Sequence, residues 1–240
     1  MQQFNHIQII YQDNDLLVIN KPSGIVVNRA ESVKEETIQD FMDSSFPLSF
    51  INPNEREFNS RSGVVHRLDK ETSGLMVLAK NNEAFQKLKL QFKNRQTKKR
   101  YVALVHGKLE PKKGTVNLPL KRNPLNRMRF TVKTDGKMAR TEYEVEALKK
   151  TEKGQDFSLL SINLKTGRTH QIRVHFSFLG FPLVSDPIYL GKRLKDDLLW
   201  CPRIFLHAKY LAFFHPHDNR LMKFNSELPE DLTKALNYLR

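Results

Sequence analysis

Three short segments of the chain carry side chains that could do chemistry. The first is residues 64–77 (VVHRLDKETSGLMV), where two apolar runs flank a polar centre and Thr-Ser-Gly supplies turn-forming residues. Loops held between strands often carry functional residues, so this pattern presents Arg67 and Asp69 as candidates. A salt-bridged hairpin loop without a catalytic role would explain the same spacing.

The second segment, residues 165–175 (KTGRTHQIRVH), gathers basic side chains at the start of an expected helix. Thr169 is a suitable N-cap residue, and free backbone N–H groups at such an end attract anions. The site could hold a phosphate or an ionised carboxylate. A solvated basic helix is the alternative. The basic residues concerned are Arg168, His170, Arg173 and His175.

The third segment is residues 98–104 (KKRYVAL), in which three bases precede a tyrosine and an apolar run. The bases could follow a nucleic-acid backbone while Tyr101 stacks on a nucleobase. A tyrosine at the start of a strand is more often ordinary sheet packing, so this segment alone decides nothing.

Composition narrows the class of partner. Forty Lys and Arg residues against 26 Asp and Glu give a net charge of +14, which favours a polyanion such as nucleic acid. The single cysteine, Cys201, excludes an intramolecular disulfide and fits a reducing cytoplasm. No signal peptide and no apolar run of membrane-spanning length is present, so we expect a soluble, cytoplasmic protein.

The elements that must position these segments follow from apolar spacing. Helical spacing predicts helices over residues 35–46, 85–92, 171–179 and 229–239. Strand patterns occur at residues 15–20, with 24–27 as a possible returning partner, and at 101–105, 142–148 and 160–164. Residues 47–62 are polar and irregular and are expected to form a flexible loop. Strands that do not alternate regularly with helices predict an α+β fold with a mixed, mainly antiparallel sheet.

Taken together, these segments resemble the RluA-type RNA pseudouridine synthases. The resemblance is centred on residues 66–69 (HRLD) followed by 72–75 (TSGL), and its motifs extend over residues 14–214 in the family's order. The other matching motifs are 17–24 (LVINKPSG), 99–107 (KRYVALVHG), 166–175 (TGRTHQIRVH), 180–187 (GFPLVSDP) and 206–208 (LHA).

The resemblance implies roles for individual residues. It makes Asp69 the catalytic carboxylate, Tyr101 the tyrosine that stacks on the uracil, and Arg168 the basic residue that pairs with the aspartate. Arg67 matches an arginine that enters the base stack as the target uridine leaves. The residues expected to contact substrate are Arg67, His66, His170, Arg173 and Leu206, the last matching an apolar neighbour of the base.

The resemblance also sets expectations for the whole molecule. It implies one catalytic domain over residues 1–240, with helices flanking the sheet and a central RNA-binding cleft. Residues 1–12 would be a short extension, without a separate N-terminal RNA-binding domain. No cofactor and no metal is expected, because isomerising uridine adds and removes nothing. The expected partner is structured RNA, with ribosomal RNA favoured over transfer RNA, and no membrane or obligate protein partner. A monomer is the expected state.

Two other classes of function compete with this interpretation. An RNA-binding or ribosome-assembly protein could keep the fold without turnover, although binding alone does not require a carboxylate facing an anionic ligand. A metal-dependent nuclease could use the eight histidines, although His170 and His175 lack acidic neighbours in sequence. The chemical route of Asp69 also stays open: attack on C1′, attack on C6, or abstraction of a sugar proton.

Overall fold

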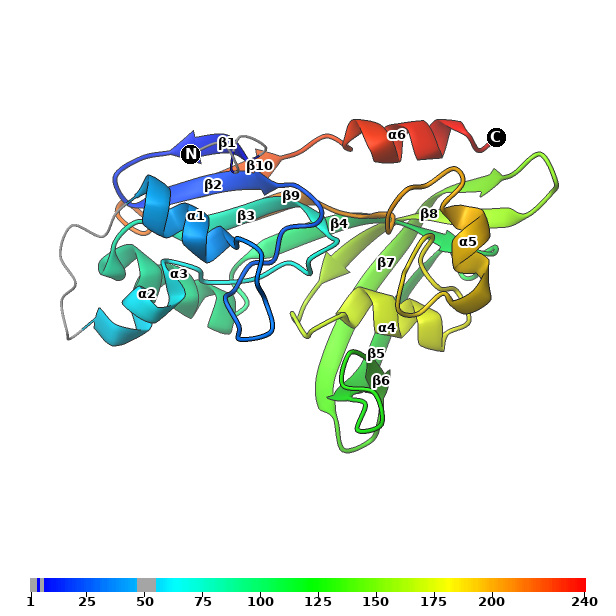
Figure 1. The fold of residues 1–240 in the computed structure, drawn as a ribbon, viewed down its shortest axis with the longest axis horizontal. Helices are drawn as coiled ribbons and strands as arrows, with labels where there is room; N and C mark the ends of the chain where they lie inside the picture. Colours follow the sequence, from blue (N-terminus) through cyan, green and yellow to red (C-terminus); the bar gives the residue numbers. More distant parts are fainter. Residues whose placement is uncertain (1–3, 5–6, 47–54) are drawn as a thin grey trace. The chain divides into compact units, whose positions relative to one another are not determined.

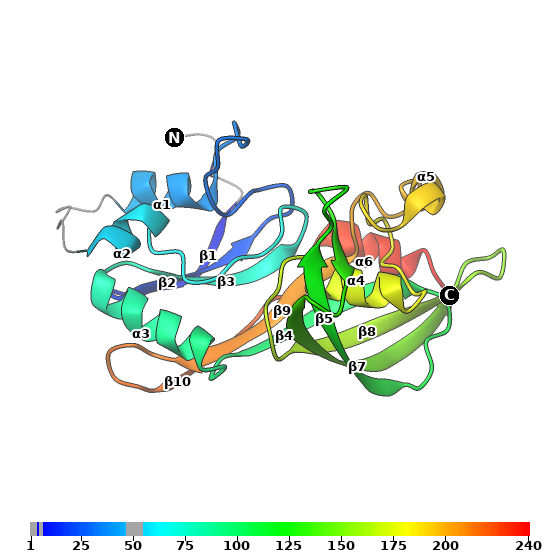
Figure 2. The ribbon, with the colours of Figure 1, turned by 90° about the horizontal axis from the view of Figure 1, so that it is seen from below.

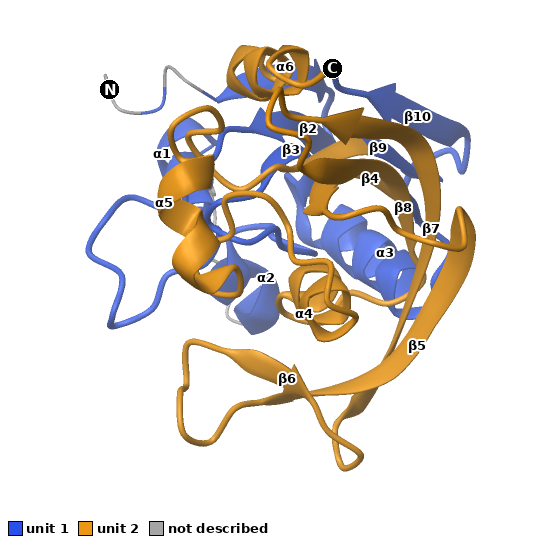
Figure 3. Cartoon of the chain, turned by 90° about the vertical axis from the view of Figure 1, so that its right-hand side faces the viewer, with its two compact units in different colours: residues 1–98, 210–226 blue, residues 99–209, 227–240 orange. Residues whose placement is uncertain are grey.

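The chain folds into two compact units, which a computed structural model describes at residues 4, 7–46 and 55–240 (Figures 1 and 2). The first unit comprises residues 1–98 and 210–226, and the second comprises residues 99–209 and 227–240 (Figure 3). Within the described residues, no helix combines the length and apolar character that a membrane crossing requires.

Antiparallel pairing builds the sheet of the first unit. Strand β2 lies between β1 and β3, and every residue of β2 except Asn20 is buried, as expected for a central strand. Part of β9 also belongs to this unit, lies next to β3 and pairs with β10. The strands are β1 (Gln8–Gln12), β2 (Leu16–Lys21), β3 (Ser73–Ala79), β9 (Leu206–Phe214) and β10 (Leu221–Asn225).

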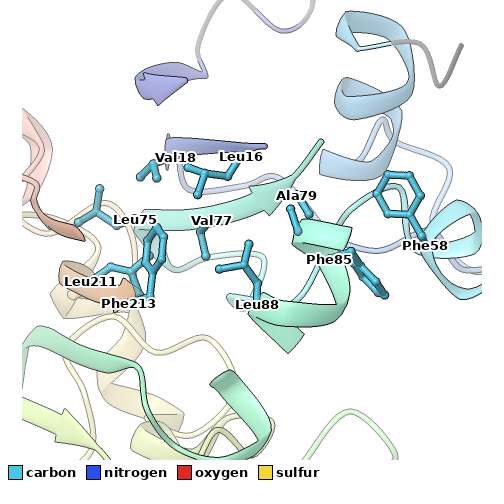
Figure 4. Packing of buried hydrophobic residues seen from close by; sticks show 11 residues of the cluster. Leu16, Val18, Phe58, Leu75, Val77, Ala79, Phe85, Leu88, Leu211 and Phe213 are labelled. Carbon is cyan, nitrogen blue, oxygen red and sulfur yellow. The ribbon is translucent and has the colours of Figure 1, made fainter. Parts of the chain in front are cut away.

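In the described part of this unit, the sheet is accompanied by α1 (Ile38–Ser45), α2 (Arg56–Arg61) and α3 (Asn82–Lys93). Thr37 begins α1 with a reciprocal capping box to Asp40, and the Asn81 side chain caps α3. The buried face of α3 packs its aromatic and aliphatic side chains against β2 and β3 (Figure 4). This packing confirms the helices predicted from the spacing of apolar residues.

Two predictions for the first unit are wrong. Residues 24–27 do not return as a strand, because their backbone groups bond elsewhere: Gly24 donates to Lys70, and Val26 and Val27 accept from the start of α1. The partners of β2 are β1 and β3 instead. Of the predicted flexible loop, residues 47–54 lie outside the described residues, and residues 56–61 form helix α2 around buried Phe58.

The second unit has strands in the order β9-β4-β8-β7-β5-β6. The pairs β4–β8, β8–β7, β7–β5 and β5–β6 are antiparallel. The strands not yet introduced are β4 (Lys98–His106), β5 (Lys113–Arg122), β6 (Phe130–Val132), β7 (Lys137–Lys150) and β8 (Asp156–Leu164). The mixed, mainly antiparallel sheet with helices confirms the expected α+β class.

Alternation along β4 and β8 gives this sheet two different faces. Val102 and Leu104 point to the face where Leu232 and Ala235 of helix α6 (Glu230–Asn237) pack. Tyr101 is opposite Ile162, which is also opposite Tyr143, so these three lie on the other face. Helix α4 (Gln171–Phe178) covers that face, with Phe176 edge-on to Tyr143. A short helix, α5 (Leu194–Asp197), follows.

Candidate active site

Asp69 lies half-buried in a loop of the first unit that leads into β3. Its backbone carbonyl accepts from the Thr72 N–H at 3.1 Å, which closes a tight turn, and the adjacent Leu68 is buried. His66 folds back on the sheet: its Nε2 accepts from the Val77 N–H at 3.1 Å. The side chain of Arg67 is exposed. The loop is therefore anchored on both sides of an outward-facing arginine.

Gly63 fixes the beginning of this loop against the end of β3. It has φ +75°, and a Cβ there would come within 2.0 Å of the Ala79 carbonyl oxygen, so only glycine fits. The Ala79 N–H in turn donates to the Gly63 carbonyl at 2.9 Å. The approach is possible because the residue has no side chain.

A turn that follows β2 holds the other end of the loop. The ammonium of Lys21, with a fully buried side chain, donates to the carbonyls of Pro22 at 2.7 Å, Ile25 at 2.9 Å and Lys70 at 3.0 Å. Gly24 N–H also donates to the Lys70 carbonyl at 2.9 Å. The motif LVINKPSG thus works as a clamp on the residue that follows Asp69.

Tyr101 and Lys99 occupy one face of β4 in the second unit. Tyr101 is buried, and Lys99, two residues earlier, points to the same side. A Cβ built on Gly167 would lie 3.7 Å from Lys99 Nζ, so the lysine reaches the turn that carries Arg168. Burial lowers the pKa of Lys99 below its ordinary value. The sequence pattern groups Lys99 with two other basic residues that could follow a nucleic-acid backbone, although its alternation with Tyr101 could have assigned its face.

The turn of Arg168 is built around the side-chain amide of Gln171. Its Oε1 accepts from the Thr166 hydroxyl at 2.7 Å and from the Arg168 N–H at 3.0 Å. Its Nε2 donates to the Arg140 carbonyl at 3.1 Å and to the Thr141 hydroxyl at 2.9 Å. This buried amide has all its hydrogen-bonding groups in use, so the turn is fixed to β7 while the Arg168 side chain stays exposed.

The predicted N-cap of α4 is wrong. His170, not Thr169, is the residue before the helix, and it has φ 54° and ψ 22° with no capping bond from its side chain. The Gln171 amide instead accepts from the Arg168 N–H before the helix begins. A threonine N-cap requires an extended backbone at the residue before the helix, and His170 at that position is left-handed instead.

The other predicted substrate contacts lie in different surroundings. Arg173 is buried, and its Nε and Nη2 both donate to Asp186 at 2.8 Å, the geometry of a structural ion pair. Leu206 is a buried residue at the start of β9. The contact roles predicted for these two residues, and for His66 and His170, stay predictions. His66 and Arg67 share the first unit with Asp69, whereas Tyr101, Arg168, His170 and Arg173 belong to the second.

One group in the described part of the chain has donor atoms close enough for a metal ion. Oxygen and nitrogen atoms of Asp13, Asp15 and His215 lie within 4.8 Å of one another. Asp13 accepts from the Tyr11 hydroxyl, from His215 Nε2, and from the N–H groups of Asp15 and Leu16. Burial opposes ionisation of Asp13, but these hydrogen bonds prevail and lower its pKa to about 2. These contacts account for the group as a structural tie, and sequence spacing could not have revealed it because His215 lies 202 residues after Asp13.

Comparison with known proteins identifies the family. The family model for RNA pseudouridylate synthase matches residues 15–178. The uncharacterized RNA pseudouridine synthase YlyB of Bacillus subtilis (strain 168) is 40% identical over 235 residues, covering 98% of this chain and 73% of that protein. Ribosomal large subunit pseudouridine synthase D of Nitrosomonas europaea is 39% identical over 239 residues, covering 98% of this chain and 65% of that protein. The chain thus spans only part of the length of both relatives.

Solved structures agree with the sequence matches. Human RNA pseudouridylate synthase domain containing 1 superposes with a TM-score of 0.73 and 28% identity, covering 95% of this chain and 86% of the human chain. Human RNA pseudouridylate synthase domain containing 4 shares the fold, with a TM-score of 0.71 and 24% identity over 97% of this chain and 94% of that chain. The chain therefore belongs to the RNA pseudouridine synthases, a family of isomerases.

Proposed function

We propose that this enzyme isomerises specific uridines of structured ribosomal RNA, and that Asp69 is its catalytic carboxylate. The observation that carries the proposal is the loop of residues 66–72, in which Asp69 is half-buried and which is held at both ends. A carboxylate that must meet one atom of a flipped nucleotide needs such a fixed mount, because small displacements cost large factors in rate.

The reaction defines what the site must do. The N1–C1′ bond breaks, the uracil turns, and C5 joins C1′; C5 loses its hydrogen and N1 gains one, so atoms balance without a co-reactant. Asp69 would act as an ionised carboxylate toward the sugar or the ring. Tyr101 would stack on the uracil from the face of β4 that it shares with Lys99, and Arg168 would pair with the carboxylate.

Access to the uridine requires that it leave the helix. Flipping a base out costs a few kcal/mol, and a side chain that fills the gap offsets part of this cost. Arg67 suits that role because it is exposed between two anchored residues, Leu68 and His66. Its guanidinium can stack on the neighbouring bases.

The choice of RNA is supported by the relatives' names. The Nitrosomonas europaea and Pseudomonas aeruginosa relatives, 39% and 38% identical to this chain, are named ribosomal large subunit pseudouridine synthase D. We propose the same class of RNA, large-subunit ribosomal RNA, as the substrate here. The proposal includes a monomeric enzyme of the cytoplasm, in keeping with a chain whose one cysteine is buried.

The test is a comparison of two RNA classes. Large-subunit ribosomal RNA and bulk transfer RNA, both unmodified and carrying tritium at uracil C5, would be incubated separately with the enzyme. Tritium should be released to water from the ribosomal RNA, in an amount equal to the pseudouridine formed. Release from transfer RNA alone would overturn the proposed substrate. RNA binding without release from either would favour a binding protein that has kept the fold.

A further inference from the structure

Tyr189 lies at the junction of three segments of the second unit. Its ring is buried beside Leu120, Ala139 and Val174, between β5, β7 and α4. The guanidinium carbons of Arg129 and Arg173 are each 5.3 Å from the centre of the ring, within the range of a cation–π contact.

The backbone around Tyr189 is fixed by a buried carboxylate. The N–H groups of Ile188 and Tyr189 donate to Asp186 Oδ1 at 2.9 and 3.1 Å. The same oxygen accepts from Arg173 at 2.8 Å. Asp186 is fully buried, so this network holds the tyrosine in one position.

The hydroxyl of Tyr189 joins two segments far apart in sequence. It accepts from the Phe130 N–H at 2.8 Å, at the start of β6, and lies 3.0 Å from His170 Nδ1, before α4. A tyrosine hydroxyl has one hydrogen and two lone pairs, so it can accept from Phe130 while donating to an unprotonated Nδ1. Phe130 and His170 also contact each other edge to face, with ring centres 5.9 Å apart.

The two segments that the hydroxyl joins are the basic hairpin tip and the turn of Arg168. Phe130 follows the tip of the β5–β6 hairpin, residues 121–129, and pairs with β5. The tip contains four basic residues and the exposed side chains of Leu125 and Met128. His170 is two residues from Arg168 and has a left-handed backbone, which residues other than glycine rarely adopt without support from their surroundings. The hydroxyl supplies such support.

We propose that Tyr189 is a positioning residue that fixes the basic hairpin and the Arg168 turn relative to each other through its hydroxyl. The inference rests on the role proposed above for Arg168 and extends it. The basic side chains of the hairpin and the guanidinium of Arg168 are thereby held in one rigid arrangement within the second unit. Loss of the hydroxyl weakens both RNA binding and turnover without unfolding the unit.

The test begins with Tyr189→Phe, which keeps the ring, its burial and both cation–π contacts. The rate of tritium release from saturating C5-tritiated large-subunit ribosomal RNA should fall about tenfold, because the half-buried Phe130 N–H loses its acceptor and the His170 turn loses its anchor. The dissociation constant for the RNA should rise severalfold, with the urea midpoint nearly unchanged. Tyr143→Phe, a similarly buried tyrosine of the same unit, is the matched control and should leave all three unchanged.

A double-mutant cycle separates positioning from general damage. His170→Gly keeps the left-handed backbone accessible but removes Nδ1. If Tyr189 acts through His170, the double variant is no slower than the more impaired single variant. Fold-changes that multiply, or a Tyr189→Phe enzyme with wild-type rate and affinity, overturn the proposal.

Failure of the proposed function is distinguishable from failure of this inference. An Arg168→Met enzyme with an unchanged rate would remove the role of Arg168, while the cycle would still decide whether Tyr189 and His170 act together. If the ribosomal RNA is bound but not modified, the double-mutant cycle is evaluated from the dissociation constants alone. Additive losses of affinity would then refute the coupling.

Discussion

At the scale of single residues, the fold devotes a buried lysine to the loop of Asp69. Lys21 satisfies three backbone carbonyls, one of which belongs to the residue after Asp69. Burying an ammonium is costly unless it is fully hydrogen-bonded, so this arrangement is only stable with all partners in place. Lys21 thus links the end of strand β2 to the loop of Asp69 and makes it a rigid support for that loop.

Substituting Lys21 by Met should destabilise the protein by on the order of 1–3 kcal/mol, because buried carbonyls lose their donor. Urea denaturation measures this change, and turnover should fall with it as the loop loosens. Lys34→Met, at an exposed position, is the control and should change the free energy of unfolding by less than about 0.5 kcal/mol. Equal stability of the two variants would contradict the clamp.

The family resemblance of the sequence motifs predicts roles for Asp69, Tyr101 and Arg168, and these roles stay predictions. The residues that support them in the structure could not be predicted from the sequence. The partners of Lys21 and Gln171 are mostly backbone groups, which every residue possesses, so no side-chain pattern announces them. The position of Tyr189 could not be predicted either, because its hydroxyl partners, the Phe130 N–H and His170 Nδ1, are brought together only by the tertiary fold.

At the scale of elements, helix α4 is tied to β7 and β5 through polar contacts of a buried histidine. His175 Nδ1 lies 2.9 Å from the Thr141 hydroxyl, and Nε2 lies 3.3 Å from the Leu118 carbonyl. Since the Thr141 oxygen already accepts from Gln171, its hydrogen is available to an unprotonated Nδ1. Burial lowers the pKa of His175 below its ordinary value.

This shift predicts the pH dependence of stability. Below about pH 6.5 the unfolded chain binds a proton at this histidine before the folded chain does, so the free energy of unfolding falls as pH decreases toward the folded pKa. In His175→Gln, that part of the decrease should disappear, whatever the variant's stability at neutral pH. Urea denaturation between pH 7.5 and 5 compares the two slopes. Parallel slopes would show that His175 is not the titrating group.

Elements with a clear apolar period were predictable, and those without one were not. Helix α3 and strands β7 and β8 match the prediction because their buried faces repeat at the helical or the strand period. Strand β1 lacks such a period, since it is a mostly exposed edge strand. Helix α2 buries only Phe58, too little to distinguish it from a loop.

At the scale of the whole molecule, the net charge of +14 should dominate RNA affinity. Two of the basic residues in the hairpin tip, residues 121–129, are the exposed Lys121 and Arg127. Each phosphate contact contributes about 0.7–0.9 to the slope of log affinity against log salt concentration. The double variant Lys121→Gln/Arg127→Gln should therefore lower the slope by about 1.5.

The control for this prediction makes the same charge change elsewhere in the second unit. The control is Lys149→Gln/Lys153→Gln. These two lysines lie at or just after the C-terminal end of β7, whereas the N-terminal end of β7, at Lys137, pairs with β5. Filter binding of large-subunit ribosomal RNA at several salt concentrations gives both slopes. If the two double variants have equal slopes, RNA is bound by overall charge and not by the hairpin.

The division into two compact units was not predictable. The single catalytic domain over residues 1–240 stays a prediction. Strand β9 crosses from the second unit into the first at residues 209–210, and residues 227–240 return to the second. Each unit combines segments that are far apart in sequence, and local apolar patterns do not predict which distant segments contact each other.

Asp69 is the residue proposed to perform the isomerisation. The most direct measurement is tritium release from C5-tritiated large-subunit ribosomal RNA by Asp69→Asn beside the wild-type enzyme, with RNA binding measured on both. We predict no release above background from the variant, RNA affinity within a few-fold of wild type, and an unchanged urea midpoint. Release by Asp69→Asn at a rate near that of the wild type would contradict the account, because another group would then carry the reaction.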